Sequence, residues 1–316
     1  MKTLIADRFS ENARSGLSAE GVAIDYRPDL GGDGLAEALA DTGADVLVVR
    51  STPVDAGALA AGGLRLVIRA GAGYNTIDVE VATGLGIRVS NCPGGNAHAV
   101  AELAFGLMLA LDRHIPDSAL DLRQGRWNKT GYSDAAGLHG STLGLLGLGN
   151  TALAMVPRAH AFGMPVVAWS RSLTTDRALE LGVRFVATPL DVAAADIVSV
   201  HVALNADTRG LVDASFLEAM RPGAMLINTS RAEVVDEAAL AHAVKTKGLR
   251  AGLDVFSGEP SAGVGAVDNP LFRLLGVIGT HHTGGATRQA QQAIADETVR
   301  IILEFRATGI APNAVN

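Results

Sequence analysis

The 316-residue chain contains a single cysteine, Cys92, and few aromatic residues, which make up 4% of the sequence. One thiol cannot form an intrachain disulfide, and it excludes zinc sites built from several cysteines. Long apolar runs are scarce as well. The longest, residues 98–113, is interrupted by His98 and Glu102 and is too short to cross a membrane.

Positive charge is also in short supply. The chain has 26 Lys and Arg against 33 Asp and Glu, a net charge of −7, and no stretch is dense in basic residues. We therefore expect neither nucleic acid nor an anionic membrane as a partner. The apolar stretch at the N-terminus is too short for a signal peptide, so we expect a cytoplasmic protein.

What the chain does have is a core-forming composition, 48% hydrophobic, and a length that suits two domains. Short β-branched runs alternate with longer segments of helical period, a pattern typical of parallel sheets covered by helices on both faces. We expect strands within residues 3–7, 22–27, 45–50, 65–70, 87–91, 142–147, 165–170, 183–187, 196–202, 224–230, 248–255 and 276–280.

One long helix, expected at 96–113, separates two such runs of alternation, and a second, at 286–305, can return the chain to the first domain. The sequence thus predicts an α/β protein with two doubly wound parallel-sheet domains. The domain at 97–284 would be inserted into one built from residues 1–96 and 285–316. A ligand cleft is expected between them.

The stretch LGLLGLGNTALA has the form of a dinucleotide-binding turn between a strand and a helix. Gly147 would allow the tight turn, and Gly149 would let the backbone approach a pyrophosphate. Ala152 is small enough for the helix to pack closely on the strand. Asn150 and Thr151 open the helix, whose N-terminus favours phosphate. A tight turn without a ligand is the alternative.

The next strand should end on an acid if the cofactor were NAD, because a carboxylate there binds the ribose 2′-hydroxyl. That position, 23 residues after Gly147, is Ser170, and Arg171 follows it. An Arg can accept the 2′-phosphate of NADP. These two residues favour NADP over NAD, although a surface Ser-Arg pair without a preference is the alternative.

Three residues past strand ends suit the reduction of a 2-oxo acid, namely Arg231, Glu259 and His282. An Arg binds a carboxylate with two parallel hydrogen bonds. A His donates a proton near neutral pH, and a carboxylate beside it keeps it protonated and oriented. His281 and His282 are adjacent and rarely share a ligand face, so we expect no metal site.

Taken together, these segments resemble the D-2-hydroxyacid dehydrogenase family along nearly the whole chain. Within the family, the phosphoglycerate dehydrogenase-like and hydroxypyruvate/glyoxylate reductase-like branches are the most similar. The resemblance implies a Rossmann-type cofactor domain inserted into a flavodoxin-like substrate domain, with no additional C-terminal regulatory domain. The matching segments are VRSTPV, RAGAGYNTID, NCPGGNAHAVAELAFGLMLALDR, GRWNK, LGLLGLGNTA, DTRGLVDASFLEAMRPGAMLINTSRAEVVDEAAL, AGLDVFSGEP and HHTGGAT.

The resemblance also implies roles for individual residues. Arg231 would hold the substrate carboxylate and carbonyl, His282 would be the acid/base, and Glu259 its hydrogen-bonded partner. The loop at 70–73 would offer backbone N–H groups to the substrate. The remaining positions that it implies are Arg50, Ala72, Gly73 and Asn96 for the substrate, and Ala203, Ser230, Asp254 and Gly284 for the cofactor.

Several positions depart from the family pattern without removing a catalytic group. They are Ser170 in place of an acid, Ala203 and His281 in place of Pro, Thr283 in place of Ile, and Ala232-Glu233 in place of two Gly. Ala203 would loosen the loop over the cofactor, and Glu233 would place a carboxylate near the site. Cofactor preference and substrate fit are the properties that these changes affect.

The sequence therefore predicts an NAD(P)-dependent oxidoreductase that moves a hydride between the nicotinamide and a small D-2-hydroxy acid or 2-oxo acid. Arg50 and Lys129 would suit a phosphorylated acid such as 3-phosphoglycerate, whereas glyoxylate or hydroxypyruvate needs only one Arg. The alternative is a nicotinamide-sensing binding protein without turnover, since fold does not fix function. The resemblance implies a homodimer, although the apolar faces of the 96–113 helix fit an intramolecular core equally well.

Overall fold

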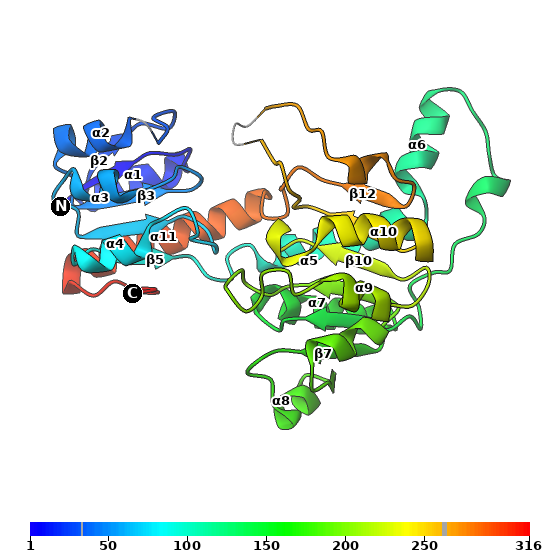
Figure 1. The fold of residues 1–316 in the computed structure, drawn as a ribbon. Coiled ribbons are helices and arrows are strands. Elements are labelled where there is room, and N and C mark those ends of the chain that lie inside the picture. The colour runs from blue at the N-terminus through cyan, green and yellow to red at the C-terminus, as the bar shows by residue number, and fades with distance from the viewer. Residues whose placement is uncertain (33, 261–263) are drawn as a thin grey trace. The chain divides into compact units, whose positions relative to one another are not determined.

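The computed structural model of the protein describes residues 1–32, 34–260 and 264–316. These residues form two compact units, coloured along the chain in Figure 1. Unit 1 comprises Met1–Asn96 and Ala286–Asn316, and unit 2 comprises Ala97–Gly285. No helix among the described residues combines the length and the apolar character that a membrane crossing requires.

Unit 1 contains a five-stranded parallel sheet in the order β2-β1-β3-β4-β5. Helices α2, α3 and α4 pack on one face through residues such as Leu39 and Leu59, and α1 and α11 pack on the other through residues such as Leu17 and Ile301. The strands are β1 Lys2–Ile5, β2 Ala23–Tyr26, β3 Val46–Val49, β4 Leu66–Arg69 and β5 Arg88–Asn91. The helices are α1 Glu11–Ala19, α2 Leu35–Thr42, α3 Ala56–Ala60, α4 Val79–Gly84 and α11 Arg288–Thr308.

Unit 2 contains a seven-stranded parallel sheet in the order β12-β11-β10-β9-β6-β7-β8. Helices α5, α7 and α8 contribute to the core on one face, and α9 and α10 to the core on the other. The strands are β6 Leu143–Leu146, β7 Val166–Trp169, β8 Arg184–Phe185, β9 Ile197–Val200, β10 Met225–Asn228, β11 Arg250–Leu253 and β12 Val277–Gly279.

The α-helices of unit 2 are α5 Ala97–Asp112, α6 Ile115–Arg123, α7 Asn150–Ala161, α8 Thr175–Glu180, α9 Ala214–Ala219 and α10 Glu237–Lys247. Short 3₁₀ turns lie at η1 Thr130–Tyr132, η2 Pro189–Ala194, η3 Ala232–Val234 and η4 Pro270–Arg273. Most helices begin at a side chain that accepts a hydrogen bond from the first turn, which fixes their start. These N-cap side chains belong to Ser10, Asp55, Asp78, Thr174, Asp213, Asp236 and Thr287.

The two strand orders confirm the predicted fold class of two doubly wound parallel sheets. In unit 2 the order reverses at β6, which lies between β9 and β7. Ligands of open α/β sheets bind beyond the carboxyl ends of the strands at such a reversal. The segment that follows β6 is therefore the place where a functional site is expected in unit 2.

One segment of unit 2 is not anticipated by the alternating pattern. Helix α6 and the chain after it extend away from the sheet of unit 2 in Figure 1. None of the nine residues of α6 is buried, although the helix carries Ile115, Leu120 and Leu122. In contrast, α5 packs its apolar residues, among them Met108, into the core of unit 2. The apolar faces of α5 thus serve an intramolecular core.

Two glycines of unit 2 differ in how closely their surroundings are packed. A Cβ atom on Gly144, in β6, would lie 2.7 Å from Cγ1 of Val192 and 2.9 Å from Cβ of Ala195. A Cβ atom on Gly106, which is exposed on α5, would have no atom within 4 Å. The same substitution therefore overpacks one site and fits freely at the other.

We expect Gly144→Ala to lower the free energy of unfolding by about 1–3 kcal/mol, the usual cost of overpacking a core. Gly106→Ala should raise it by about 0.5–1 kcal/mol, because Ala is the better helix former. Thermal unfolding followed by circular dichroism measures both changes. Shifts of Tm in the same direction in both variants would contradict the close packing of η2 against β6.

Candidate active site

The residues expected to bind the cofactor or to act in catalysis follow the carboxyl ends of neighbouring strands in unit 2. Because the sheet is parallel, all of these ends lie at one of its edges. Figure 1 labels three of its strands, β7, β10 and β12. Gly147 and Gly149 follow β6, Ser170 and Arg171 follow β7, Ala203 follows β9, Ser230 and Arg231 follow β10, Asp254 and Glu259 follow β11, and His282 and Gly284 follow β12.

The turn after β6 has the geometry that a pyrophosphate needs. Gly147 has φ +97°, and a Cβ atom there would lie 2.8 Å from the backbone N of Val202, so only glycine fits. Gly149 is the N-cap of α7 and provides no side-chain cap. The first amides of α7 are thus left to a ligand, and an anion is favoured there. Ala152 is fully buried, which lets α7 pack closely. These features fit a dinucleotide.

His201 closes the floor of this turn. Its backbone carbonyl carbon would lie 2.9 Å from a Cβ atom on Gly147. Burial lowers the pKa of His201 to about 4, so its ring is neutral at physiological pH. Nε2 of that ring lies 2.8 Å from Oγ of Ser199. The hydrogen bond fixes the ring, and His201 supports the turn as a neutral residue.

Ser170 and Arg171 lie beside this turn, after β7. Nη1 of Arg171 forms an ion pair with Oδ2 of Asp207 at 3.1 Å, and both side chains are well exposed. The sequence pattern does not single out Asp207, which follows β9. Its sequence signals are the Asn205-Ala206-Asp207-Thr208 string, typical of a turn fixed by an Asn side chain, and its place at the start of a segment that resembles the family.

Arg231 is presented by a short turn that a buried amide fixes. Asn228, the last residue of β10, is 1% exposed. Its Nδ2 donates to the carbonyl oxygen of Arg231 at 2.9 Å, and its Oδ1 accepts from N and Oγ of Ser230. The two residues that replace the family's glycines, Ala232 and Glu233, begin the 3₁₀ turn η3. Asn228 is a positioning residue that the sequence signals only as a polar end to an apolar strand.

The predicted pair of His282 and Glu259 is present. Nδ1 of His282 lies 2.7 Å from Oε2 of Glu259, and Oε1 of that carboxylate accepts from the backbone N of Phe256 at 2.9 Å. Burial acts to raise the pKa of Glu259, but the hydrogen bonds from His282 and Phe256 and the charges of His282 and Arg231 outweigh it. The pKa of Glu259 is therefore lowered, and the carboxylate stays ionised at neutral pH.

His282 has an uncommon backbone conformation, with φ +52°. Asp254 holds it there: its carbonyl oxygen accepts from N of His282 at 2.9 Å. Its carboxylate accepts from Oγ1 of Thr280 and from N of Thr283 and Gly284 at 2.6–2.9 Å. Asp254 is 2% exposed. The hydrogen bonds of its buried carboxylate fix the loop that carries His282. Its expected role beside the nicotinamide stays a prediction.

The residues expected to bind substrate through unit 1 also follow strand ends. Arg50 follows β3, Ala72 and Gly73 follow β4, and Asn96 follows β5. Nδ2 of Asn91 donates to the carbonyl oxygen of Ala72 at 2.6 Å, which fixes that loop. Their assignment to the substrate stays a prediction.

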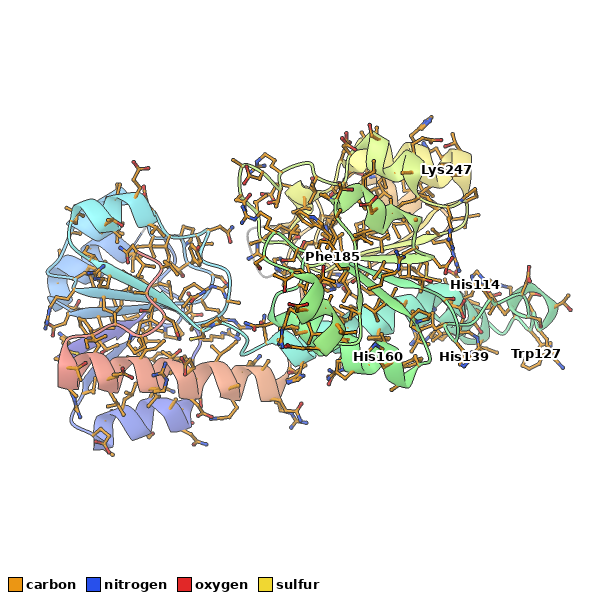
Figure 2. The ribbon with its side chains drawn as sticks, turned by 90° about the horizontal axis from the view of Figure 1, so that it is seen from below. His114, Trp127, His139, His160, Phe185 and Lys247 are labelled. Carbon is orange, nitrogen blue, oxygen red and sulfur yellow. The ribbon has the colours of Figure 1, made fainter. Side chains whose placement is uncertain are left out.

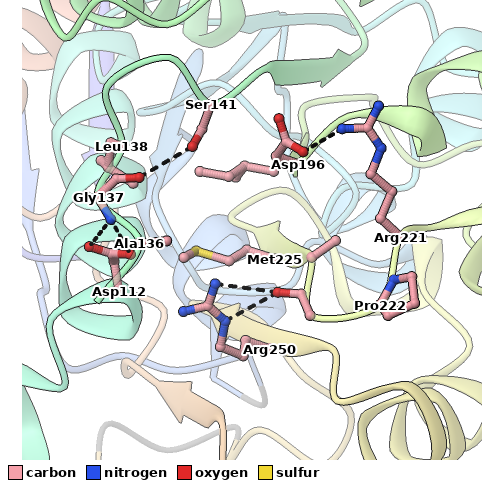
Figure 3. A pocket seen from close by; sticks show the side chains of 13 residues that line it. Asp112, Ala136, Gly137, Leu138, Ser141, Asp196, Arg221, Pro222, Met225 and Arg250 are labelled. Carbon is pink, nitrogen blue, oxygen red and sulfur yellow. Dashed lines mark hydrogen bonds and ion pairs between the residues drawn. The ribbon is translucent and has the colours of Figure 1, made fainter. Parts of the chain in front are cut away.

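A cavity of about 230 Å³ lies at the opposite edge of the unit 2 sheet, near the amino ends of its strands (Figure 3). Its charged groups already have partners: Asp196 pairs with Arg221, Asp112 accepts from N of Gly137, and Arg250 donates to the carbonyl of Gly223. Strand amino ends are not where such sheets bind cofactors. Within the described residues, no group of three His, Cys, Asp or Glu side chains could hold a metal ion.

Comparison with known proteins agrees with this geometry. The family model of the D-isomer specific 2-hydroxyacid dehydrogenase NAD binding domain matches residues 105–284. The hydroxypyruvate reductase of Thermotoga maritima is 39% identical over 84% of this chain and 85% of that protein. The structure of the NADPH-dependent glyoxylate/hydroxypyruvate reductase of Sinorhizobium meliloti, with NADP and malonate, superposes with a TM-score of 0.85 at 30% identity, over 99% of this chain and 96% of that one.

The D-3-phosphoglycerate dehydrogenase of Mycobacterium bovis is 38% identical over 99% of this chain. The chain spans only 58% of the length of that relative. The family match covers more than half of the chain, and it agrees with the motifs that first indicated the resemblance. The chain belongs to the D-isomer-specific 2-hydroxyacid dehydrogenase family.

Proposed function

We propose that the protein is an NAD(P)-dependent dehydrogenase that interconverts a D-2-hydroxy acid and the corresponding 2-oxo acid. The observation that carries this proposal is the hydrogen bond of 2.7 Å between Nδ1 of His282 and Glu259, with the charge of Arg231 acting on the same carboxylate. These groups lie at the sheet edge that carries the glycine turn. An acid/base and a carboxylate-binding cation thus lie beside a dinucleotide site.

The chain's residues divide the work of the reaction. Arg231 binds the substrate carboxylate and orients the carbonyl, since a guanidinium and a carboxylate form two parallel hydrogen bonds. Glu259 occupies Nδ1 of His282, so Nε2 is the atom that gives its proton to the carbonyl oxygen. A bound nicotinamide supplies the hydride for C2 of the 2-oxo acid. In the reverse direction, Nε2 takes the proton of the hydroxyl group.

The dinucleotide site supports the cofactor class. Gly147, Gly149 and Ala152 provide the close backbone approach and the uncapped start of α7 that a pyrophosphate requires. We assign unit 2 to the cofactor and unit 1 to the substrate. The Sinorhizobium meliloti structure contains NADP, and either NAD or NADP fits the residues named so far.

The substrate class is a small 2-oxo acid. The named relatives act on 3-phosphoglycerate and hydroxypyruvate, and both are three-carbon acids with an oxygen at C2. A binding protein that senses nicotinamide without turnover is the less favoured function, because a sensor has no need of the His282–Glu259 pair. Direct assay separates the two: glyoxylate, hydroxypyruvate and phosphohydroxypyruvate are each offered with NADH and with NADPH. A protein that binds a dinucleotide but oxidises neither one with any of these acids would contradict the proposal.

His282→Ala should lower kcat at least ~100-fold, the usual loss when a general acid is removed. Steady-state kinetics on the best 2-oxo acid measures it. His281→Ala is the matched control, because His281 is the exposed neighbour and should change kcat by less than about threefold. Similar losses in both variants would rule out a specific proton transfer by His282.

Glu259→Gln should lower kcat for reduction by about 10- to 100-fold, because a charge-assisted hydrogen bond to the imidazolium is lost. The pH profile should change as well: the wild-type rate should fall as the pH drops through the lowered pKa of Glu259, and Glu259→Gln should lack this fall. Because the pKa of Glu259 is lowered, its ionised carboxylate also stabilises the folded state. This stabilisation is present above the ordinary carboxyl pKa range and is lost as the pH falls through the lowered pKa. Glu180→Gln, on the exposed side of α8, is the control, and an unchanged pH profile in Glu259→Gln would contradict the pairing.

We propose that the protein is a homodimer joined through α6 and the chain that follows it. Four large apolar side chains in this segment are 49–80% exposed, and α6 buries none of its own residues. Figure 2 shows Trp127 far out on the segment. Large apolar side chains left exposed along one segment indicate an interaction surface. They are Ile115, Leu120, Leu122 and Trp127.

Sedimentation velocity tests the dimer. The wild-type chain should sediment as a species of twice 32.4 kDa, and the double variant Leu120→Glu/Leu122→Glu should sediment as a monomer, because two charges would be buried in the interface. Leu179→Glu is the control, since Leu179 is 81% exposed on α8. A wild-type monomer at micromolar concentration, or a double variant that stays dimeric, would exclude this interface.

A further inference from the structure

We propose that Asp207 supplies, from the loop after β9, the ribose-reading carboxylate that Ser170 lacks at the end of β7. Its ion pair with Arg171 then makes NAD the preferred cofactor and lets NADP bind only when the pair is broken. This inference rests on the proposed function, because it concerns the same dinucleotide site.

The sheet order places the two residues on either side of the glycine turn. Strand β6 lies between β9 and β7, so the loops after β9 and β7 flank the turn that begins at Gly147. Asp207 belongs to the first loop and Arg171 to the second, and the ion pair of 3.1 Å joins them. The pair therefore bridges the two loops beside the turn, and its Arg171 follows β7, the strand after which a dinucleotide's adenosine ribose is read in sheets of this type.

The position of Asp207 is set by its own loop. Oδ1 of Asn205 accepts from N of Asp207 at 2.9 Å and from N of Thr208 at 3.2 Å. Oγ1 of Thr208 donates to the carbonyl oxygen of Ala203 at 2.6 Å, and Thr208 is 5% exposed. These bonds tie the loop down even though Ala203 stands where the family has Pro. Asp207 is thus held by backbone contacts as well as by its salt bridge.

The charges decide which ribose is accepted. A carboxylate at this site accepts a hydrogen bond from the 2′-hydroxyl of NAD and repels the 2′-phosphate of NADP. An Arg alone would attract that phosphate. With both present, a 2′-phosphate must take the guanidinium of Arg171 away from Asp207 and then lie next to an uncompensated carboxylate. The local sequence Ser170-Arg171 favours NADP, and Asp207 reverses that preference.

The ion pair of Arg171 and Asp207 is exposed, so its effect on the choice between NAD and NADP depends on the solution conditions. The side chains of Arg171 and Asp207 are 67% and 73% exposed, so a ligand can reach both. An exposed ion pair contributes little to stability, and either residue can be changed without unfolding the protein. Added salt screens such charges, so the discrimination between the two cofactors should weaken as the ionic strength rises.

Equilibrium binding measured by calorimetry tests the proposal without substrate or turnover. NAD⁺, NADP⁺, 5′-AMP and 2′,5′-ADP are titrated into the wild-type chain and into Asp207→Asn, Arg171→Ala and the double variant. Wild type should bind NAD⁺ more tightly than NADP⁺. Asp207→Asn should bind NADP⁺ and 2′,5′-ADP about tenfold more tightly, as expected when a like charge is removed from beside a phosphate, and the double variant should lose this gain. The control is Asp268→Asn, an exposed Asp that pairs with Arg273, which should leave every affinity unchanged.

Two results would overturn the proposal, and they have different consequences. If wild type binds the dinucleotides but Asp207→Asn leaves the ratio of NADP⁺ to NAD⁺ affinity unchanged, the selection by Asp207 is wrong and the proposed function stands. If wild type binds neither dinucleotide, both this inference and the proposed function are wrong. The 5′-AMP and 2′,5′-ADP titrations separate an effect at the ribose from one elsewhere in the site.

Discussion

A buried carboxylate must have hydrogen-bond donors, and the geometry of the candidate active site in unit 2 depends on how Asp254 meets this requirement. Asp254 directly follows β11, and its donors come from the segment after the neighbouring strand β12. Satisfying the carboxylate therefore fixes the loop that carries His282, including its left-handed backbone. Asn228 does the same for Arg231 at the end of β10. The positions of Arg231, Glu259 and His282, the groups proposed for catalysis, are thus set by three adjacent strands, β10, β11 and β12.

Local features of the fold were predictable because their causes are local. The strand–turn–helix around Gly147 needs a glycine for reasons that lie within a few residues, and the structure gives φ +97° there. The expected helix at 96–113 is observed as α5, Ala97–Asp112, and the helix at 286–305 as α11, Arg288–Thr308. The pairing of His282 with Glu259 also follows from the sequence, but only through the family resemblance, since 23 residues separate the two.

Features that depend on tertiary neighbours could not be predicted in this way. The pairing of Asp207 with Arg171 exists because β6 lies between β9 and β7, and no spacing in the sequence reports that adjacency. The position of α6 could not be predicted from an apolar face, because none of its residues is buried in the core of unit 2. The family resemblance assigned Asp254 to the cofactor site, but it did not indicate which groups its carboxylate binds. The hydrogen bonds to Thr280, Thr283 and Gly284 are seen only in the structure.

The nesting of unit 2 within the chain has a consequence for how the protein is made. One face of the unit 1 sheet is covered by α11, whose Ile301, Ile302 and Phe305 complete a core begun by Ile5 and Val46. On the ribosome, Ile5 must wait for Ile301 of α11 for roughly 15–60 s at 5–20 residues per second. Unit 2 is contiguous and can fold during that delay. The apolar strands of unit 1 thus lack the helix that covers one face of their sheet throughout this delay.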